Sequence, residues 1–272
     1  MFSLIKSDFY KLWRDNKFWI FSLMAVGFAI LGVTSSRIAG TYTDASGKVT
    51  LVYRTSQELL SGNLLGRVLI LASIFITIFI VSEFSCGILP VNVARGAPRI
   101  QIYFSKLIAS ICSFFILSIL DILTSFICVR VAVEKFLLPD NFLLGLSFKI
   151  FISLCWICVV VAIAFFLKSK VWTITIVLLA IVLGSTGIER IVDPLVASIF
   201  KLPEVNLEHY WLLNYSSQAI FESGTRWIKE NLNHFFYGEL NYYIILGMVV
   251  SICYAIPAGV IGALKFRRGD LK

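Results

Sequence analysis

The chain is 272 residues long; 58% of the residues are hydrophobic, only 15% are charged, and the mean hydropathy is +0.88. Soluble domains carry charged residues at about a quarter of their positions, so this composition excludes an ordinary soluble domain and indicates an integral membrane protein. The formal net charge of +8 is explained below by membrane topology, and we expect no nucleic-acid partner.

Residues 1–17 predict an amphipathic helix. Apolar side chains recur there at steps of three and four residues, with basic and polar residues between them. Because such helices lie at a membrane interface, we expect an interfacial elbow helix that leads into the first span. At this point it could be a lipid anchor alone or could also contact a cytoplasmic partner. Its apolar positions are Phe2, Ile5, Phe9, Leu12 and Trp13.

Six apolar runs have the length of about 17–25 residues that crosses a bilayer. We expect the first run to be retained, because no signal-peptide cleavage site follows it. The sequence therefore predicts an all-α integral membrane protein with a single six-helix transmembrane domain over residues 18–272. The runs are Phe18–Thr34, Leu64–Ser82, Leu107–Val129, Phe142–Leu167, Val171–Ile188 and Tyr242–Leu264.

The basic residues predict how these spans are oriented. Six spans place both termini on one side, together with segments 82–106 and 168–170, and this side holds more than half of the 24 Lys and Arg residues. An excess of Lys and Arg in short loops marks the cytoplasmic side. We therefore expect both termini in the cytoplasm and the chain in the cell membrane.

Two long loops, 35–63 and 189–241, are expected on the outer side. The first is rich in Thr, Ser and Gly and predicts a surface loop or short strands. The second interleaves aromatic and charged residues, so we expect it to be ordered, with at least two short helices and part of its length against the membrane or bundle. It could cover a substrate or form only an interfacial belt.

The sequence lacks the motifs of common enzymes. It has no G-x-x-x-x-G-K-[ST] loop, and its two histidines, His209 and His234, lie in the second outer loop rather than in an H-E-x-x-H pair. Cys155 and Cys158 form a C-x-x-C pair, but without a second pair or a nearby histidine they do not predict a metal site. We expect no enzymatic activity, no disulfide and no metal or cofactor on this chain.

Two charged residues lie within the spans. Asp121 is near the middle of the third span, where a carboxylate facing lipid costs at least about 2.5–3.5 kcal/mol, so we expect it inside the helix bundle. Arg130 follows nine residues later on the opposite helix face, which makes Lys149 in the fourth span the better candidate partner. A structural ion pair and a role in a substrate path are both compatible with these positions.

The segment between the second and third spans is polar and punctuated. Ser82–Leu107 carries one acidic and several basic residues and is interrupted by glycines and prolines. The breaks at Pro90 and at Gly96–Pro98 predict a short helix over Val91–Ala94, with two arginines at its C-terminal side. A basic cytoplasmic tether would not need both breaks, so we expect a structured element between the second and third spans.

Taken in order, these features resemble the membrane subunit of type-2 ATP-binding-cassette (ABC) transporters, a permease family whose bacterial members include bacitracin-type and lantibiotic-immunity exporters. The family has an elbow helix, then E-x-x-x-G-[IT] after the second span, then G-x-x-R and a lysine that opens the third span. Here these motifs are Glu83 with Gly87-Ile88, the variant GAPR at Gly96–Arg99, and Lys106. The resemblance implies that the short helix between the second and third spans is a cytoplasmic coupling helix. It also implies that this segment docks into an ATPase subunit through Glu83, Gly87, Asn92, Arg95, Gly96 and Arg99.

The resemblance also implies a function. The chain would be the permease subunit of an ATP-driven exporter in a bacterial plasma membrane, with ATP bound to the separate ATPase subunit and a second permease chain, identical or similar, completing the path. The mostly apolar spans favour a hydrophobic or amphipathic cargo, such as an antimicrobial peptide in antibiotic resistance or a lipid-like molecule. The alternative is a non-transporting membrane scaffold or sensor on the same fold.

Overall fold

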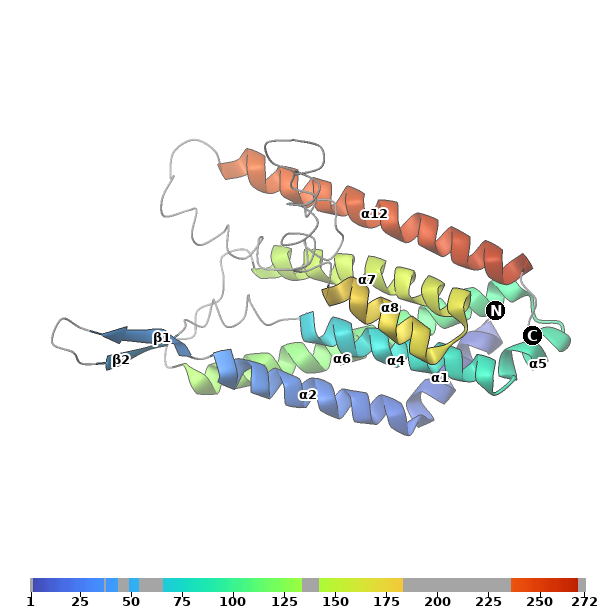
Figure 1. The fold of residues 1–272 in the computed structure, drawn as a ribbon, viewed down its shortest axis with the longest axis horizontal. Coiled ribbons are helices and arrows are strands. Elements are labelled where there is room, and N and C mark those ends of the chain that lie inside the picture. Colours follow the sequence, from blue (N-terminus) through green and yellow to red (C-terminus); the bar gives the residue numbers. More distant parts are fainter. Residues whose placement is uncertain are drawn as a thin grey trace.

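The computed structural model describes residues 2–36, 38–43, 49–53, 66–133, 142–182 and 236–268. In these ranges long helices run side by side along the longest axis of the molecule, and a strand pair extends from one end (Figure 1). The helices are α1 Phe2–Arg14, α2 Asn16–Ser36, α4 Gly66–Ser85, α5 Ile88–Ala94, α6 Arg99–Ala132, α7 Phe142–Leu167, α8 Lys170–Val182 and α12 Phe236–Arg268.

Within the described residues, five helices are long and apolar enough to cross a membrane: α2, α4, α6, α7 and α12. These helices make the chain a multi-pass membrane protein. The expected fifth span, Val171–Ile188, corresponds in part to α8, which is described over 13 residues. Residues 183–188 lie outside the described ranges, so the sixth span stays a prediction.

Two helices begin more than a full turn earlier than the hydropathy predicted. The third span was expected from Leu107, but α6 begins at Arg99 and has 34 residues. At about 1.5 Å per residue it is roughly 51 Å long and exceeds a hydrocarbon core of about 30 Å. The last span was expected from Tyr242, but α12 begins at Phe236. The additional turns of α6 carry Arg99, Ser105 and Lys106, whose side chains contact other helices rather than lipid.

The first predicted outer loop contains an antiparallel strand pair, β1 Ile38–Thr43 and β2 Val49–Tyr53, in which Thr41 lies opposite Leu51. Short strands were one of the two predictions for this loop, so the described fold is helical with one hairpin rather than entirely α. The second outer loop lies outside the described residues up to position 235. Its predicted short helices therefore stay predictions, and from Phe236 onward it is part of α12.

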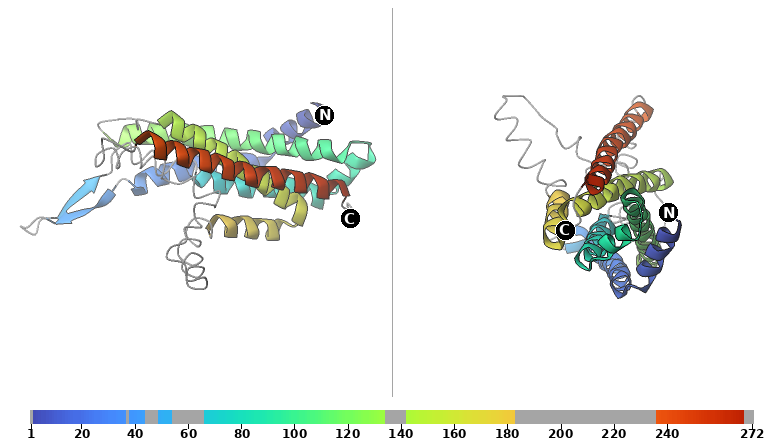
Figure 2. Two further views of the ribbon diagram at one scale, coloured as in Figure 1. Left: turned by 90° about the horizontal axis from the view of Figure 1, so that it is seen from above. Right: turned by 90° about the vertical axis from the view of Figure 1, so that its right-hand side faces the viewer.

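The core forms around α4. Of the residues in the most apolar stretch of α4, 67% are buried inside the bundle. The corresponding fractions are 33% for α2 and 22% for α12. Phe75 of α4 anchors α2, with its ring centroid 5.5 Å from that of Phe18 and 5.7 Å from that of Phe21. Seen end-on, α12 lies at one side of the bundle, away from α2 (Figure 2). The outward faces of α2 and α12 are apolar and exposed, as surfaces that contact lipid or another membrane protein are.

The contact between α12 and α7 depends on a residue without a side chain. A Cβ atom on Gly262 would lie 3.0 Å from Cβ and 3.1 Å from Cα of Ala162, and 2.8 Å from the hydroxyl of Tyr103. Small residues allow membrane helices to approach this closely. Gly259, one turn away, would place its Cβ in open space.

We predict opposite effects of Gly262→Ala and Gly259→Ala. The first should lower the free energy of unfolding by about 1–3 kcal/mol, because the Ala162 backbone cannot move aside without separating the two helices. The second should be neutral or mildly stabilising, since alanine favours a helix over glycine by up to about 1 kcal/mol. Thermal unfolding of the two variants in one detergent checks this, and equal shifts would contradict the packing described.

Candidate functional site

The segments predicted to be cytoplasmic gather at one end of the bundle. There α1, α5, the turn between α7 and α8 and the last turn of α12 lie together (Figures 1 and 2). The ammonium of Lys168 in the α7–α8 turn lies 6.0 Å from the ring centroid of Phe84 on α4. Arg99 at the start of α6 contacts the end of α12. We call this region the basic end.

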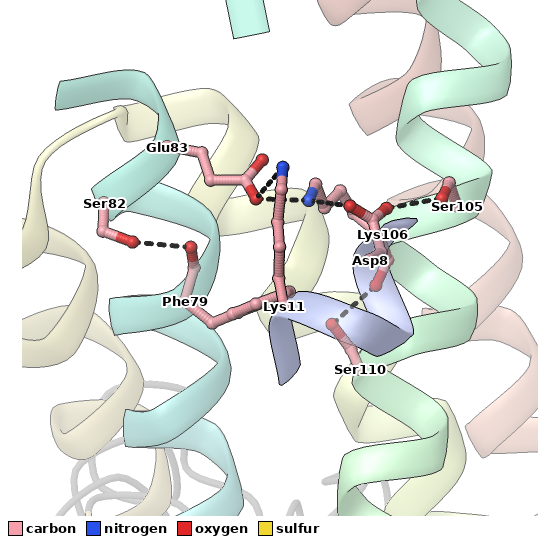
Figure 3. Close-up of polar contacts among 8 residues, drawn as sticks. All are labelled: Asp8, Lys11, Phe79, Ser82, Glu83, Ser105, Lys106 and Ser110. Carbon is pink, nitrogen blue, oxygen red and sulfur yellow. Dashed lines mark hydrogen bonds and ion pairs between the residues drawn. The ribbon is translucent and has the colours of Figure 1, made fainter. Parts of the chain in front are cut away.

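A buried ion network joins three helices at the basic end. The ammonium of Lys106 on α6 lies 2.6 Å from Oδ1 of Asp8 on α1 and 2.6 Å from Oε1 of Glu83 on α4 (Figure 3). The three residues are 1%, 6% and 4% exposed, respectively. The hydroxyl of Ser105 donates to Oδ2 of Asp8 at 2.5 Å. Each helix thus contributes one charge to a common contact.

The charges of the network balance only when Lys11 is included. Its ammonium lies 3.3 Å from Oε1 of Glu83, and 36% of its side chain is exposed. The Lys106 ammonium also lies 4.9 Å from the ring centroid of Phe79, within the range of a cation–π contact. Oε2 of Glu83 is buried and has no hydrogen-bond partner among the described residues. The network is therefore neutral and leaves one acceptor open.

Asp8 and Ser105 are site residues that sequence reasoning missed. The prediction for α1 followed its apolar positions and assigned no role to Asp8. In the structure Asp8 is buried one turn before Leu12, so the inward face of α1 combines an acid with apolar residues. A carboxylate four residues before a buried leucine, together with a lysine at the start of a span, is the signal that could have identified the pair.

We predict that Lys106→Met lowers the free energy of unfolding by about 3–5 kcal/mol, because Asp8 stays buried without a counter-charge and Glu83 keeps only the half-exposed Lys11. The combined Asp8→Asn, Glu83→Gln, Lys106→Met variant should recover most of this loss, since it removes every charge of the buried triad. Lys11→Met should cost less than about 1 kcal/mol, as for an exposed ion pair. Thermal unfolding in detergent measures all three, and a triple variant as unstable as Lys106→Met would exclude charge imbalance as the cause.

Two glycines define the short helix α5. Gly87 precedes it with φ of 68°, and Gly96 follows it with φ of 88°, both in the left-handed region that glycine adopts without steric cost. The N–H of Gly96 donates to the carbonyl of Val93 at 2.9 Å, and that of Ala97 to the carbonyl of Asn92 at 3.2 Å. This pair of bonds is a Schellman cap, so the C-terminal end of α5 is fixed.

The predicted boundaries of this helix were wrong at one end. Val91–Ala94 was expected with Pro90 as a break, but α5 begins at Ile88 and includes Pro90 in its first turn. A proline is tolerated there because the first N–H groups of a helix have no intrahelical acceptor. The extra turn buries Leu89, which is 0% exposed and fixes α5 to the bundle, whereas Val91 is 48% exposed.

The six residues predicted for ATPase coupling occupy different environments. Gly87 and Gly96 shape the backbone, and Arg95 is exposed, while Asn92 is half-buried. Glu83 belongs to the ion network. The remaining residue, Arg99, donates through Nη1 to the main-chain oxygens of Phe266 and Arg267, at 3.4 and 3.1 Å. It therefore caps the end of α12 in addition to any role toward a partner.

An aromatic cluster supports this end of α12. Phe165 of α7 is at its centre, with its ring centroid 4.9 Å from Tyr103 of α6, 4.9 Å from Phe266 of α12 and 5.5 Å from Phe84 of α4. Edge-to-face and tilted pairs at these distances add attraction beyond area burial. Four helices are thus connected directly beside the ion network.

We predict that Arg99→Gln accelerates amide hydrogen exchange in the last two turns of α12, because carbonyls at a helix end lose a charged donor worth about 1.5–3 kcal/mol. Arg95→Gln is the matched control, since it removes the same charge from an exposed position that lies four residues earlier in the chain. Exchange measured by mass spectrometry on both variants tests the cap. Similar protection of residues 260–268 in the two variants would show that the contact is dispensable.

The two charged residues predicted within the spans, Asp121 and Lys149, are both buried in the structure. Asp121 is 1% exposed and Lys149 is 4% exposed, which confirms that the carboxylate lies inside the bundle rather than against lipid. Their mutual pairing stays a prediction. All six cysteines are free thiols, including Cys155 and Cys158. Within the described ranges, His, Cys, Asp and Glu residues form no group of three or more that could hold a metal ion.

Comparison with known proteins does not assign a family: no family model matches the sequence, and no curated protein matches it. The apolar helices define the class of protein, a multi-pass membrane protein.

Proposed function

We propose that this protein is the permease subunit of an ABC exporter and that α5 is the helix through which a separate ATPase drives it. The observation that carries the proposal is the form of α5, a helix of seven residues with glycine-defined ends between two long apolar helices. Its buried Leu89 holds it to the bundle, while Val91 and Arg95 are exposed. An exposed valine beside an exposed arginine suits a protein partner with apolar and acidic groups.

The ion network offers a way to transmit movement from α5. Glu83 is five residues before Ile88, and Lys106 follows the end of α5 by twelve positions, so both helices that flank α5 enter the same buried contact. Asp8 adds α1 to this unit. Because separating these charges inside a protein is costly, a force on α5 should move the ends of α1, α4 and α6 together.

The remaining features of the proposal rest on the sequence analysis. The basic end lies in the cytoplasm of a bacterial cell, α1 is an elbow helix at the membrane surface, and α8 belongs to a sixth span. Two permease chains, identical or similar, enclose the path, and the cargo is hydrophobic or amphipathic. The exposed apolar faces of α2 and α12 provide surface for lipid or for the second chain.

We predict that Val91→Asp combined with Arg95→Glu abolishes co-purification with the ATPase encoded nearest to this gene and reduces stimulated ATP turnover at least about tenfold, because it places acidic groups where the partner is expected to be acidic. Arg99 is left intact because it caps α12. The control, Lys170→Glu, reverses an exposed charge at the same end of the bundle and should keep both properties.

Three outcomes oppose the proposal. Retention of ATPase binding and turnover in the double variant would leave α5 without a coupling role. Binding that depends on α5 without any stimulation of ATP turnover by the wild type would favour a scaffold or sensor over a transporter. A gene neighbourhood without any reading frame that carries a phosphate-binding loop would remove the expected partner.

A further inference from the structure

A cavity of about 300 Å³ opens beside the ion network, between α1 and α4 and next to the start of α5. It is lined by Tyr10, Lys11, Arg14, Asp15, Phe79, Ser82, Glu83 and Ile88. One wall is therefore the C-terminal turn of α1, and the other is the C-terminal end of α4. The ion network fills the inner side of this region, where Glu83 approaches Lys11 (Figure 3).

The cavity lies at the level where the apolar helices end. The apolar span of α2 begins at Asn16, directly after Asp15, which lines the cavity. The apolar span of α4 ends at Ser85. Trp13 and Trp19 flank this level, 60% and 49% exposed, and their ring centroids are 5.1 Å apart. Exposed tryptophans next to the end of an apolar helix mark the headgroup region of a bilayer.

The lining carries balanced charge. Lys11 and Arg14 are basic, Asp15 and Glu83 are acidic, and Nη1 of Arg14 donates to the hydroxyl of Tyr10 at 2.8 Å. A purely anionic ligand would meet two carboxylates, and a purely cationic ligand would meet two basic groups. A ligand with one charge of each sign can satisfy both pairs.

One acceptor in the lining residues lacks a donor. Oε1 of Glu83 accepts from both Lys106 and Lys11, while Oε2 has no hydrogen-bond partner in the described part of the chain. Glu83 is 4% exposed, and a buried carboxylate oxygen without a donor is costly. A primary ammonium brings three N–H donors, whereas a trimethylated ammonium brings none.

We propose that this cavity binds the headgroup of a zwitterionic phospholipid with a primary ammonium. Lys11 and Arg14 hold the phosphate, Glu83 and Asp15 hold the ammonium, and the acyl chains follow the exposed apolar face of α2 at Ile20 and Leu23. The site depends only on the placement of the apolar helices in a membrane. It does not require the chain to transport anything.

Three lipids with identical acyl chains test the proposal: phosphatidylethanolamine, phosphatidylcholine of the same net charge, and anionic phosphatidylglycerol. Each is titrated against the full-length protein in detergent, with bound lipid counted by native mass spectrometry. Phosphatidylethanolamine should bind at least about tenfold more tightly than phosphatidylcholine, because it alone supplies ammonium hydrogen bonds to a carboxylate. It should also bind more tightly than phosphatidylglycerol.

Variants locate the site. The double variant Lys11→Gln, Arg14→Gln should weaken the binding of phosphatidylethanolamine and phosphatidylcholine alike, because both lipids carry the phosphate that these two residues hold. Asp15→Asn should reduce the preference between these two lipids while the helix start survives, because asparagine replaces aspartate well as the N-cap that accepts from the Lys17 N–H. Lys170→Gln, at the same end of the bundle but outside the cavity, should bind as the wild type does.

Several results would overturn the assignment. Equal binding of phosphatidylethanolamine and phosphatidylcholine would exclude recognition of the ammonium, and preference for phosphatidylglycerol would indicate an anion site. Unchanged affinity for phosphatidylethanolamine in the Lys11→Gln, Arg14→Gln variant would place the lipid elsewhere. If the wild type prefers no lipid and a cavity variant no longer binds the ATPase, the cavity receives a protein instead.

Discussion

The position of one buried lysine determines how the basic end is built. Lys106 is 1% exposed, so water cannot solvate its ammonium, and the carboxylates of Asp8 and Glu83 approach it from two other helices instead. The three helices are therefore held where Lys106 meets both carboxylates, and Lys11 balances the remaining negative charge. Because the attraction falls steeply when a carboxylate moves away in a medium of low polarity, this arrangement tolerates little displacement.

Neighbouring features depend on this arrangement. The short helix α5 connects α4 with α6, so its orientation follows from theirs. The left-handed glycines Gly87 and Gly96 mark where it begins and ends. Arg99 begins α6 and caps α12, which brings the last helix to the same point. The aromatic side chains around Phe165 fill the space between these helices and make the end of the bundle compact.

Hydropathy predicted which segments form long helices but not where all of them end. It marks residues that lipid can solvate, and the first turns of α6 are solvated by Asp8 and Glu83 instead. Periodicity predicted α1 but not its buried acid, because a count of apolar positions gives no information about a carboxylate whose partner is 98 residues away. The short helix α5 was predicted from its glycines and prolines, although Pro90 lies in the first turn of the helix rather than breaking it.

The separation of Asp8 and Lys106 along the chain has a consequence for assembly. At a synthesis rate of about 5–20 residues per second, the 98 positions between them take roughly 5–20 s to emerge from a ribosome. Until then Asp8 has no lysine of α6 beside it, and water at the membrane surface has to solvate its carboxylate. The helix α1 thus precedes the spans in synthesis but can take its final place only after α4 and the start of α6 are in position.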